Sequence, residues 1–402
     1  MTNPTDDDKA LPTITETEVE DWFESEETQP VDTTPAKDVV TKYAESQLRI
    51  VRTTIDFSLH TLRTSLSDSS YINMSPVYQR RNRWDIIKRS RLIESFLMNI
   101  PIPPLFLFEN DYNQYEVMDG RQRLEAIQSF LKNDYPLREL EFWKELNDHR
   151  FRDLPETIQR GLLRRTISAI VLLAETTRKS ESSEDIDVRM VLFRRLNTGG
   201  IKLNTQEIRN ALYPSEFNRM VRRVARHSLF TSLWGIPAHT PNEENDPPAK
   251  LMRNTLYKTM ADSELVLRFF AIKETIEMDL KGSLRRILDN CMERHQKDSP
   301  EAVIALENLF ITSLTKLSKA FAENPFRLPN TGRLSRPLYD ALTVAISLIP
   351  EFNTEQPIGD LQLRLNNALA DEDLYEILIG RGNTVEAIKD RVREAKRILK
   401  GE

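Results

Sequence analysis

The chain has 402 residues, with 62 acidic and 56 basic side chains and a net charge of −6. This length predicts two or three domains with hydrophobic cores. The longest apolar run, residues 167–174, is too short to span a bilayer, and the acidic start of the chain lacks the features of a secretory signal. Cys291 is the single cysteine, which excludes an internal disulfide or cysteine-rich zinc site and predicts a buried apolar residue. We therefore expect a cytoplasmic protein with no membrane partner.

Residues 1–40 carry twelve acidic and two basic side chains. Such a composition cannot bury enough apolar surface to offset the entropy of ordering. We predict a disordered acidic tail over residues 1–41, whose removal leaves the melting temperature nearly unchanged. Trp22 and Phe23 form either a short docking motif or two idle aromatic residues. The tail could also compete with nucleic acid for the more basic remainder of the chain.

Residues 42–225 mix helical and strand patterns, which predicts an α+β domain with a small sheet. Apolar residues recur at helical spacing over residues 85–98, and three nearby prolines end that helix. Asn204 and Glu207 have the spacing of a capping box that opens a further helix. The remaining expected elements are helices at 58–66 and 187–196 and strands at 71–74, 105–108, 115–118 and 167–173.

Residues 226–402 show helical patterns without strand signals and without a fixed repeat, so we predict an irregular helical domain. The expected helices cover residues 251–278, 283–295, 301–322, 336–349, 357–369, 372–380 and 384–400.

The most informative motif is the pentapeptide Asp119-Gly120-Arg121-Gln122-Arg123. It lies between an expected strand and an expected helix, where backbone N–H groups and the positive end of the helix dipole favour an anion. Two arginines add forked donors for phosphate, and an aspartate can bind Mg²⁺ or position a water molecule. The pattern indicates a phosphate or nucleotide site. A solvated surface turn capped by Asp119 is the alternative that spacing alone leaves open.

Further blocks accompany this motif along the chain. Residues 75–80, 92–97 and 100–105 precede it, and residues 193–200 and 203–211 follow it. Together they resemble the domain-of-unknown-function family that forms the N-terminal half of GmrSD-type modification-dependent restriction enzymes. The resemblance covers about residues 55–225.

The resemblance implies a ParB/sulfiredoxin-like fold and a role in phage defence. Characterised members use an Asp-Gly-Gln-Gln-Arg motif for nucleotide binding and hydrolysis, whereas this chain has Arg121 in place of the first Gln. Asp119 would then bind Mg²⁺ or polarise water, and Gln122 would orient the nucleophile. The implied nucleotide- or phosphate-binding residues are Tyr78, Gln79, Arg80, Gly120, Arg121, Arg123, Asn197, Gly199 and Gly200.

A basic cluster surrounds the start of the helix at 85–98. Arg81, Arg83, Lys88 and Arg89 either form a solvated helix face or contact the DNA backbone. Trp84 is expected to anchor the helix in the core. Glu207 is expected to serve the helix cap, while Arg209 and Asn210 could project towards the loop at residues 197–200.

GmrSD-type enzymes carry a separate C-terminal His-Asn-His nuclease domain, and none of the five histidines here has the required neighbours. There is also no phosphate loop of the P-loop NTPases. Our first hypothesis is an NTP-binding and NTP-hydrolysing protein of a restriction or phage-defence system, acting with a separate nuclease or effector subunit. The alternatives are a non-enzymatic DNA-binding adaptor, and a metal-dependent nuclease with Asp119 and Glu94 or Glu109 as ligands. Oligomers are compatible with each hypothesis.

Overall fold

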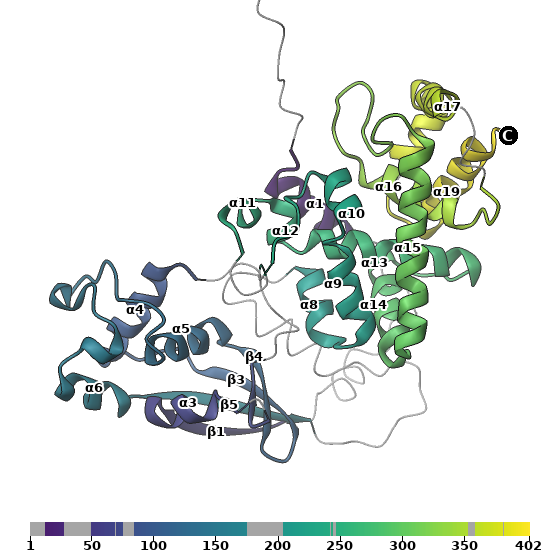
Figure 1. The fold of residues 1–402 in the computed structure, drawn as a ribbon. Helices are drawn as coiled ribbons and strands as arrows, with labels where there is room; N and C mark the ends of the chain where they lie inside the picture. Colours follow the sequence, from purple (N-terminus) through teal and green to yellow (C-terminus); the bar gives the residue numbers. More distant parts are fainter. Residues whose placement is uncertain are drawn as a thin grey trace, which may run out of the picture. The chain divides into compact units, whose positions relative to one another are not determined.

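The computed structural model describes residues 13–27, 50–68, 70–74, 84–174, 204–241, 243, 247–352, 358–380 and 382–402. The chain forms two compact units (Figure 1). The sheet unit comprises Thr33–Leu203, and the helical unit combines Met1–Asp32 with Asn204–Glu402. The predicted fold class, an α+β domain with a small sheet followed by a mainly helical region, is confirmed.

The sheet unit contains a five-stranded mixed sheet in the order β1-β5-β3-β4-β2. β3 and β4 form an antiparallel hairpin, β5 runs parallel to β3, and β2 runs parallel to β4. The strands are β1 (Ile50–Ser58), β2 (Ile72–Asn73), β3 (Leu105–Asp111), β4 (Gln114–Asp119) and β5 (Thr166–Ala174). The sequence predicted all of these strands except β1.

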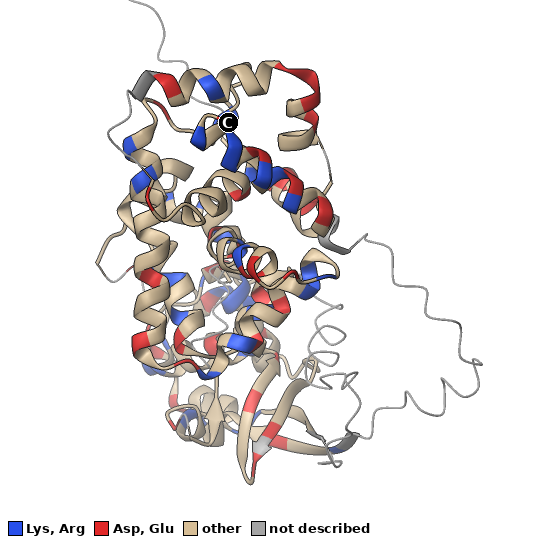
Figure 2. Ribbon diagram, turned by 90° about the vertical axis from the view of Figure 1, so that its right-hand side faces the viewer, with Lys and Arg blue, Asp and Glu red and all other residues tan. Residues whose placement is uncertain are grey.

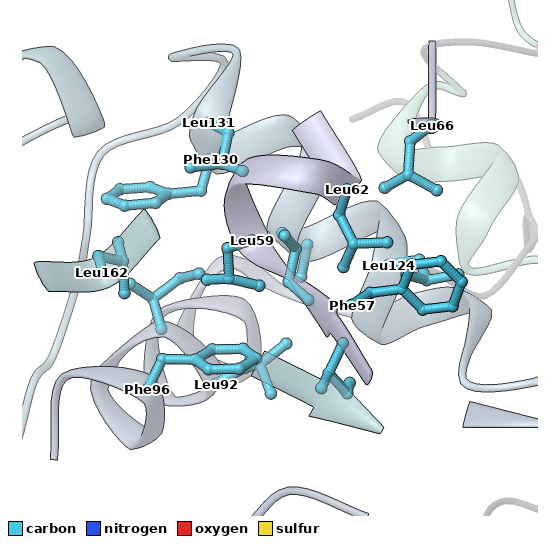
Figure 3. Packing of buried hydrophobic residues seen from close by; sticks show 14 of the residues in the cluster. Phe57, Leu59, Leu62, Leu66, Leu92, Phe96, Leu124, Phe130, Leu131 and Leu162 are labelled. Atoms are coloured by element: carbon cyan, nitrogen blue, oxygen red, sulfur yellow. The ribbon is translucent and has the colours of Figure 1, made fainter. Parts of the chain in front are cut away.

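Helices pack on one face of this sheet around a single hydrophobic core. Inward-facing residues alternate along the strands, as in Ile167, Ala169 and Val171 of β5. Figure 3 shows how Phe57, Leu124 and other apolar side chains from strand and helices meet in this core. The helices are α3 (Leu59–Ser65), α4 (Ile86–Leu97), α5 (Arg121–Leu131), η2 (Lys144–Leu146), η3 (Phe151–Asp153) and α6 (Glu156–Leu163).

The helical unit contains no strand longer than an isolated bridge among its described residues. Helices α13, α15, α16 and α19 supply much of its core. The helices are α1 (Glu16–Glu27), α8 (Thr205–Leu212), α9 (Glu216–Val224), α10 (Ser228–Trp234), α11 (Ala249–Met252), α12 (Thr255–Lys258), α13 (Ala261–Glu277), α14 (Leu284–Arg294), η5 (His295–Lys297), α15 (Pro300–Ala320), α16 (Arg336–Ser347), α17 (Ile358–Ala370), α18 (Glu372–Tyr375), η6 (Glu376–Gly380) and α19 (Val385–Lys400).

Charges in the helical unit are mixed in sign. In Figure 2, basic and acidic residues alternate along the helix that ends at the C-terminus, α19. Arg393 pairs with Asp390 and Arg397 pairs with Glu394 on this helix. Inside the unit, Arg268 of α13 is ion-paired with Asp340 of α16, and both side chains are fully buried. This pair ties two core helices together.

The prediction of a disordered acidic tail is wrong for residues 16–27, which form helix α1 and pack on the helical unit. Val19 is fully buried and Phe23 nearly so. Trp22 lies edge-on to Trp234 at 6.4 Å and under the guanidinium of Arg336 at 5.0 Å. The two aromatic residues therefore dock within the same chain. The expectation failed because composition averages over the apolar stripe of a short amphipathic helix.

Acidic residues of α1 meet basic residues of the helical unit. Glu16 accepts a bond from Lys258 at 2.7 Å, and Glu18 is ion-paired with Arg333. Residues 1–12 and 28–41 of the predicted tail lie outside the described residues.

The boundary between the two units also differs from the expected position at residue 225. It falls between Leu203 and Asn204, so helix α8 belongs to the helical unit. The predicted capping box is present: Glu207 N donates to the Asn204 side chain at 2.9 Å, and Asn204 N donates to Glu207 at 3.0 Å. No helix in the described part of the chain is both long and apolar enough to cross a membrane.

Candidate nucleotide site at the β4–α5 junction

Gly120 makes the turn from strand β4 into helix α5. Its backbone is left-handed, with φ 95° and ψ 8°, a conformation that glycine adopts without steric cost. A Cβ at this position would lie 2.4 Å from Leu105 Cδ2 and 3.0 Å from an Arg123 nitrogen. The pentapeptide therefore requires glycine for two independent reasons, its dihedral angles and its close neighbours.

Asp119 and Arg123 flank this turn and bind each other. Arg123 Nη2 donates to Asp119 Oδ2 at 2.5 Å, while Nη1 donates to the carbonyl oxygens of Pro103 and Pro104. The Arg123 side chain is 12% exposed and that of Asp119 is 35% exposed. Burial lowers the pKa of Arg123, and the charge and hydrogen bond of Asp119 oppose that shift. Arg123 thus holds Asp119 against the segment that precedes β3.

Arg121 and Gln122 begin helix α5 on the solvent side of the same turn. The Arg121 Nε donates to Glu125 Oε1 at 2.7 Å, and both side chains are about a quarter exposed or less. Gln122 is half-buried. The structure therefore brings together five predicted site residues, from Asp119 to Arg123, at one junction.

The directions of the strands show at which end of the sheet the junction lies. β2 is parallel to β4, and Asn73 pairs with Glu116. The described chain therefore leaves β2, at Met74, at the end of the sheet where β4 finishes with Asp119. β3 is antiparallel to β4, and β5 is parallel to β3, so β5 finishes at Ala174 at the opposite end of the sheet.

The other predicted nucleotide-binding residues lie outside the part of the chain that the structure describes. These are Tyr78, Gln79, Arg80, Asn197, Gly199 and Gly200. The predicted helix at residues 187–196 lies there as well.

Two of the four residues suggested for DNA contact can be placed. Lys88 is exposed on α4. Arg89 is instead half-buried: its Nε donates to Trp84 O at 2.9 Å, and its guanidinium lies 5.9 Å from the Tyr135 ring centre. Trp84 packs against the core, as expected. Arg81 and Arg83 lie outside the described residues. Of this cluster, then, the structure leaves Lys88 as an exposed cation.

Glu94 and Glu109, suggested as metal ligands beside Asp119, have other roles. The buried carboxylate of Glu94 accepts hydrogen bonds from the backbone N–H groups of residues 141–143, at 2.7–3.1 Å. Glu109 accepts from Asn113 N at the far end of the β3–β4 hairpin. Asp119 pairs with Phe106, three residues earlier on β3, so about 10 Å separates Glu109 from Asp119 along the sheet. This ligand set for a nuclease is not assembled.

Arg209 and Asn210 were expected to project towards residues 197–200, which lie outside the described residues. Both are buried in the helical unit. Arg209 Nε donates to Asp289 at 2.8 Å, and Asn210 contacts Met260 Sδ through its amide. These contacts give both residues a structural role within the helical unit.

The described residues fit Mg²⁺ only in part. Asp119 Oδ2 accepts a hydrogen bond from Arg123, and in the described ranges Asp119 belongs to no group of three or more potential metal ligands. Mg²⁺ prefers six oxygen ligands and often takes several of them from substrate phosphates and water. Asp119 could therefore supply one ligand oxygen to a magnesium ion that is held mainly by a bound nucleotide.

Two features of the junction were missed by sequence reasoning. The carbonyl oxygens of Pro103 and Pro104 accept hydrogen bonds from Arg123, which is about twenty residues away in the sequence. No local sequence pattern predicts such a contact. The pair Arg121–Glu125 has the i, i+4 spacing of a helical ion pair and could have been found.

The fold and the junction define a class of protein. A mixed α+β domain carries an ion pair between Asp119 and Arg123 at a strand-to-helix turn made by Gly120, and a helical unit follows this domain. Residues 62–214 match the family model described as GmrSD restriction endonuclease, N-terminal domain. This part of the chain is similar to the N-terminal domain of GmrSD restriction endonucleases. The match begins within α3 and ends just after α8. Searches of curated proteins and of solved structures gave no match.

Proposed function

We propose that the sheet unit binds a nucleoside triphosphate at the β4–α5 junction and hydrolyses it, as part of a restriction or phage-defence system that acts with a separate effector. The observation that carries this proposal is the Asp119–Arg123 pair, fixed on Gly120 at the start of α5. A carboxylate, two guanidinium groups and a helix N-terminus are a combination suited to a phosphate ester with its metal ion.

The two arginines suit different tasks. Arg123 has three partners and little exposure, so its contribution is to orient Asp119. Arg121 makes an i, i+4 pair with Glu125 near the surface, and such pairs contribute only about 0.5 kcal/mol. A phosphate group can compete with Glu125 for the Arg121 guanidinium. We therefore assign phosphate binding to Arg121 and positioning to Arg123.

Asp119 is the residue on which hydrolysis depends in this proposal. Its bond to Arg123 fixes the orientation of the carboxylate, and about a third of its side chain is exposed to solvent. It would bind the nucleotide's Mg²⁺ or orient the attacking water, with Gln122 beside it. In the sequence, the block with Tyr78, Gln79 and Arg80 follows Met74, and Met74 lies at the same end of the sheet as Asp119.

The test measures phosphate release from each of the four NTPs with Mg²⁺, with and without DNA, using the purified full chain. Asp119→Asn keeps the size of the side chain and should abolish release. Arg121→Gln should weaken nucleotide binding in isothermal titration. Glu109→Gln is a matched carboxylate-to-amide control in the same hairpin and should retain both activities, because its oxygen can still accept from Asn113 N.

Equal turnover in wild type and Asp119→Asn would refute hydrolysis at this site. Nucleotide binding without phosphate release in the wild type would favour the DNA-binding adaptor. The chain alone should leave plain and modified plasmid DNA intact with Mg²⁺ or Mn²⁺. Cleavage that is lost in Asp119→Asn would instead identify a nuclease.

A further inference from the structure

Helices α13 and α14 and the following turn η5 bring three different donor groups together in the helical unit. Glu274 lies near the end of α13, Cys291 lies on α14, and His295 begins η5. One carboxylate oxygen, the thiol sulfur and one imidazole nitrogen lie within 4.8 Å of one another. Cys291 and His295 are four residues apart and so share one helical face.

Neighbouring side chains orient two of these groups. His295 Nδ1 is hydrogen-bonded to Asp298 Oδ2 at 2.5 Å, which directs Nε2 towards Glu274. Arg294 binds the other oxygen of Glu274. In metal sites, a carboxylate on the outer nitrogen of a histidine fixes the ring and its tautomer, and Asp298 has this position.

The site is enclosed but reachable. Cys291 is fully buried, and the Phe217 ring stacks on His295 at 4.5 Å, so one side is apolar. The side chains of Glu274 and His295 are 13% and 15% exposed, so both ligand groups retain some contact with solvent. Three protein ligands with a fourth position open to water are typical of tetrahedral zinc.

We propose that Glu274, Cys291 and His295 form a zinc site of the helical unit, with Asp298 as the residue that positions His295. Sulfur, imidazole nitrogen and carboxylate oxygen are the three ligand types of Zn²⁺, whereas Mg²⁺ and Ca²⁺ prefer oxygen alone. Binding exchanges protons for the metal: the thiol loses its proton, Nε2 is neutral, and the carboxylate is ionised.

The competing explanation is a metal-free ion pair network. A protonated His295 would then bridge Glu274 and Asp298, and burial raises the pKa of the Cys291 thiol, which would stay protonated. The two explanations differ in the state of the sulfur, because a metal-bound cysteine is a thiolate. A spectroscopic probe of the thiolate separates them.

The experiment uses the full chain, stripped of metal with a chelator and titrated with CoCl₂. Wild type should bind one Co²⁺, with a thiolate-to-cobalt charge-transfer band and the visible bands of tetrahedral cobalt, and ZnCl₂ should abolish both. Cys291→Ser should lose the charge-transfer band. Asp298→Asn should weaken Co²⁺ binding about 10–100-fold. His227→Gln, a histidine that caps α10 through Leu229 N, is the matched control and should bind as wild type does.

ZnCl₂ should raise the melting temperature of wild type and of His227→Gln but not of Cys291→Ser. The wild-type spectrum decides the question even where a variant fails to fold. Absence of the charge-transfer band in wild type, together with no thermal shift on addition of ZnCl₂, would overturn the proposal and leave the cluster as an ion pair network.

Discussion

At the scale of single residues, Gly120 is the position on which the candidate site depends most directly. Its left-handed backbone and its contacts with Leu105 and Arg123 leave no room for a side chain. Asp119 and Arg123 pair across this turn. The glycine is therefore a requirement of the site's geometry as well as of the fold.

We expect Gly120→Ala to destabilise the sheet unit by about 1–3 kcal/mol, the cost of a strained backbone residue, with the Leu105 contact adding to it. Gly161→Ala is the control: Gly161 is exposed in helix α6, and no atom lies within 4 Å of the place that a Cβ would take there. That change should stabilise by up to about 1 kcal/mol, because alanine is the better helix former. Denaturant unfolding measures both, and equal effects would contradict the role of Gly120.

Glu94 gives the sheet unit a dependence on pH. Burial raises the pKa of this carboxyl, but the backbone N–H groups of Trp143, Phe142 and Glu141 outweigh burial and hold it below its ordinary 4.5. The folded state therefore binds its proton less readily than the unfolded state does. The resulting stabilisation is complete above about pH 4.5 and is lost as the pH falls through the folded-state pKa.

Glu94→Gln should lower stability at neutral pH by about 1–3 kcal/mol, because charge-assisted bonds to three N–H groups are weakened. It should also flatten the loss of stability below pH 4.5. Unfolding curves between pH 3 and 7 measure this. Glu145→Gln, an exposed change in the neighbouring turn, should keep the wild-type profile. If Glu94→Gln lost stability below pH 4.5 as steeply as the wild type, Glu94 would be excluded as the cause of that loss.

At the scale of secondary-structure elements, the sequence predicted the helices and strands whose stability depends on residues close together in the chain. Helix α4 was predicted within two residues, because its apolar periodicity and the Asp85 cap are properties of the segment itself. The β3–β4 hairpin followed from two apolar runs around a polar turn. The strand-to-helix turn at Asp119 to Arg123 was predicted for the same reason, and its role as a nucleotide site stays a prediction.

Elements stabilised by distant partners were missed. Strand β1 carries Arg52, Thr53 and Asp56 and is defined by its pairing with β5, more than a hundred residues away. Helix α1 has the composition of an acidic tail, and the contacts that hold it come from the distant residues Trp234 and Arg336. The burial of Arg209 likewise depends on Asp289, eighty residues later. Sequence order alone does not disclose such contacts.

Helix α1 should contribute to the stability of the helical unit. Phe23→Ala removes a nearly buried ring and should lower stability by up to about 3 kcal/mol. The exposed change Glu20→Ala on the same helix should have little effect. Thermal unfolding compares them. An unchanged melting temperature in Phe23→Ala would restore the view of residues 16–27 as a dispensable tail.

At the scale of the whole molecule, the chain consists of two units with separate cores. Domains with their own cores commonly unfold as separate cooperative steps. We expect two calorimetric transitions, one shifted by Gly120→Ala and the other by Phe23→Ala. ZnCl₂ should move only the transition that Phe23→Ala shifts. A single transition that responds to every change would instead show that the two units unfold together.

The docking of α1 has a consequence for biosynthesis. Residues 16–27 are translated well before Arg333 and Arg336, which bind the helix: roughly three hundred residues separate them, about 15–60 s at typical translation rates. The sheet unit, which has its own hydrophobic core, is translated in this interval. Helix α1 therefore cannot dock on the helical unit until Arg333 and Arg336 have been synthesised. Until then the apolar side chains of Trp22 and Phe23 lack their partners in the folded chain and are accessible to chaperones.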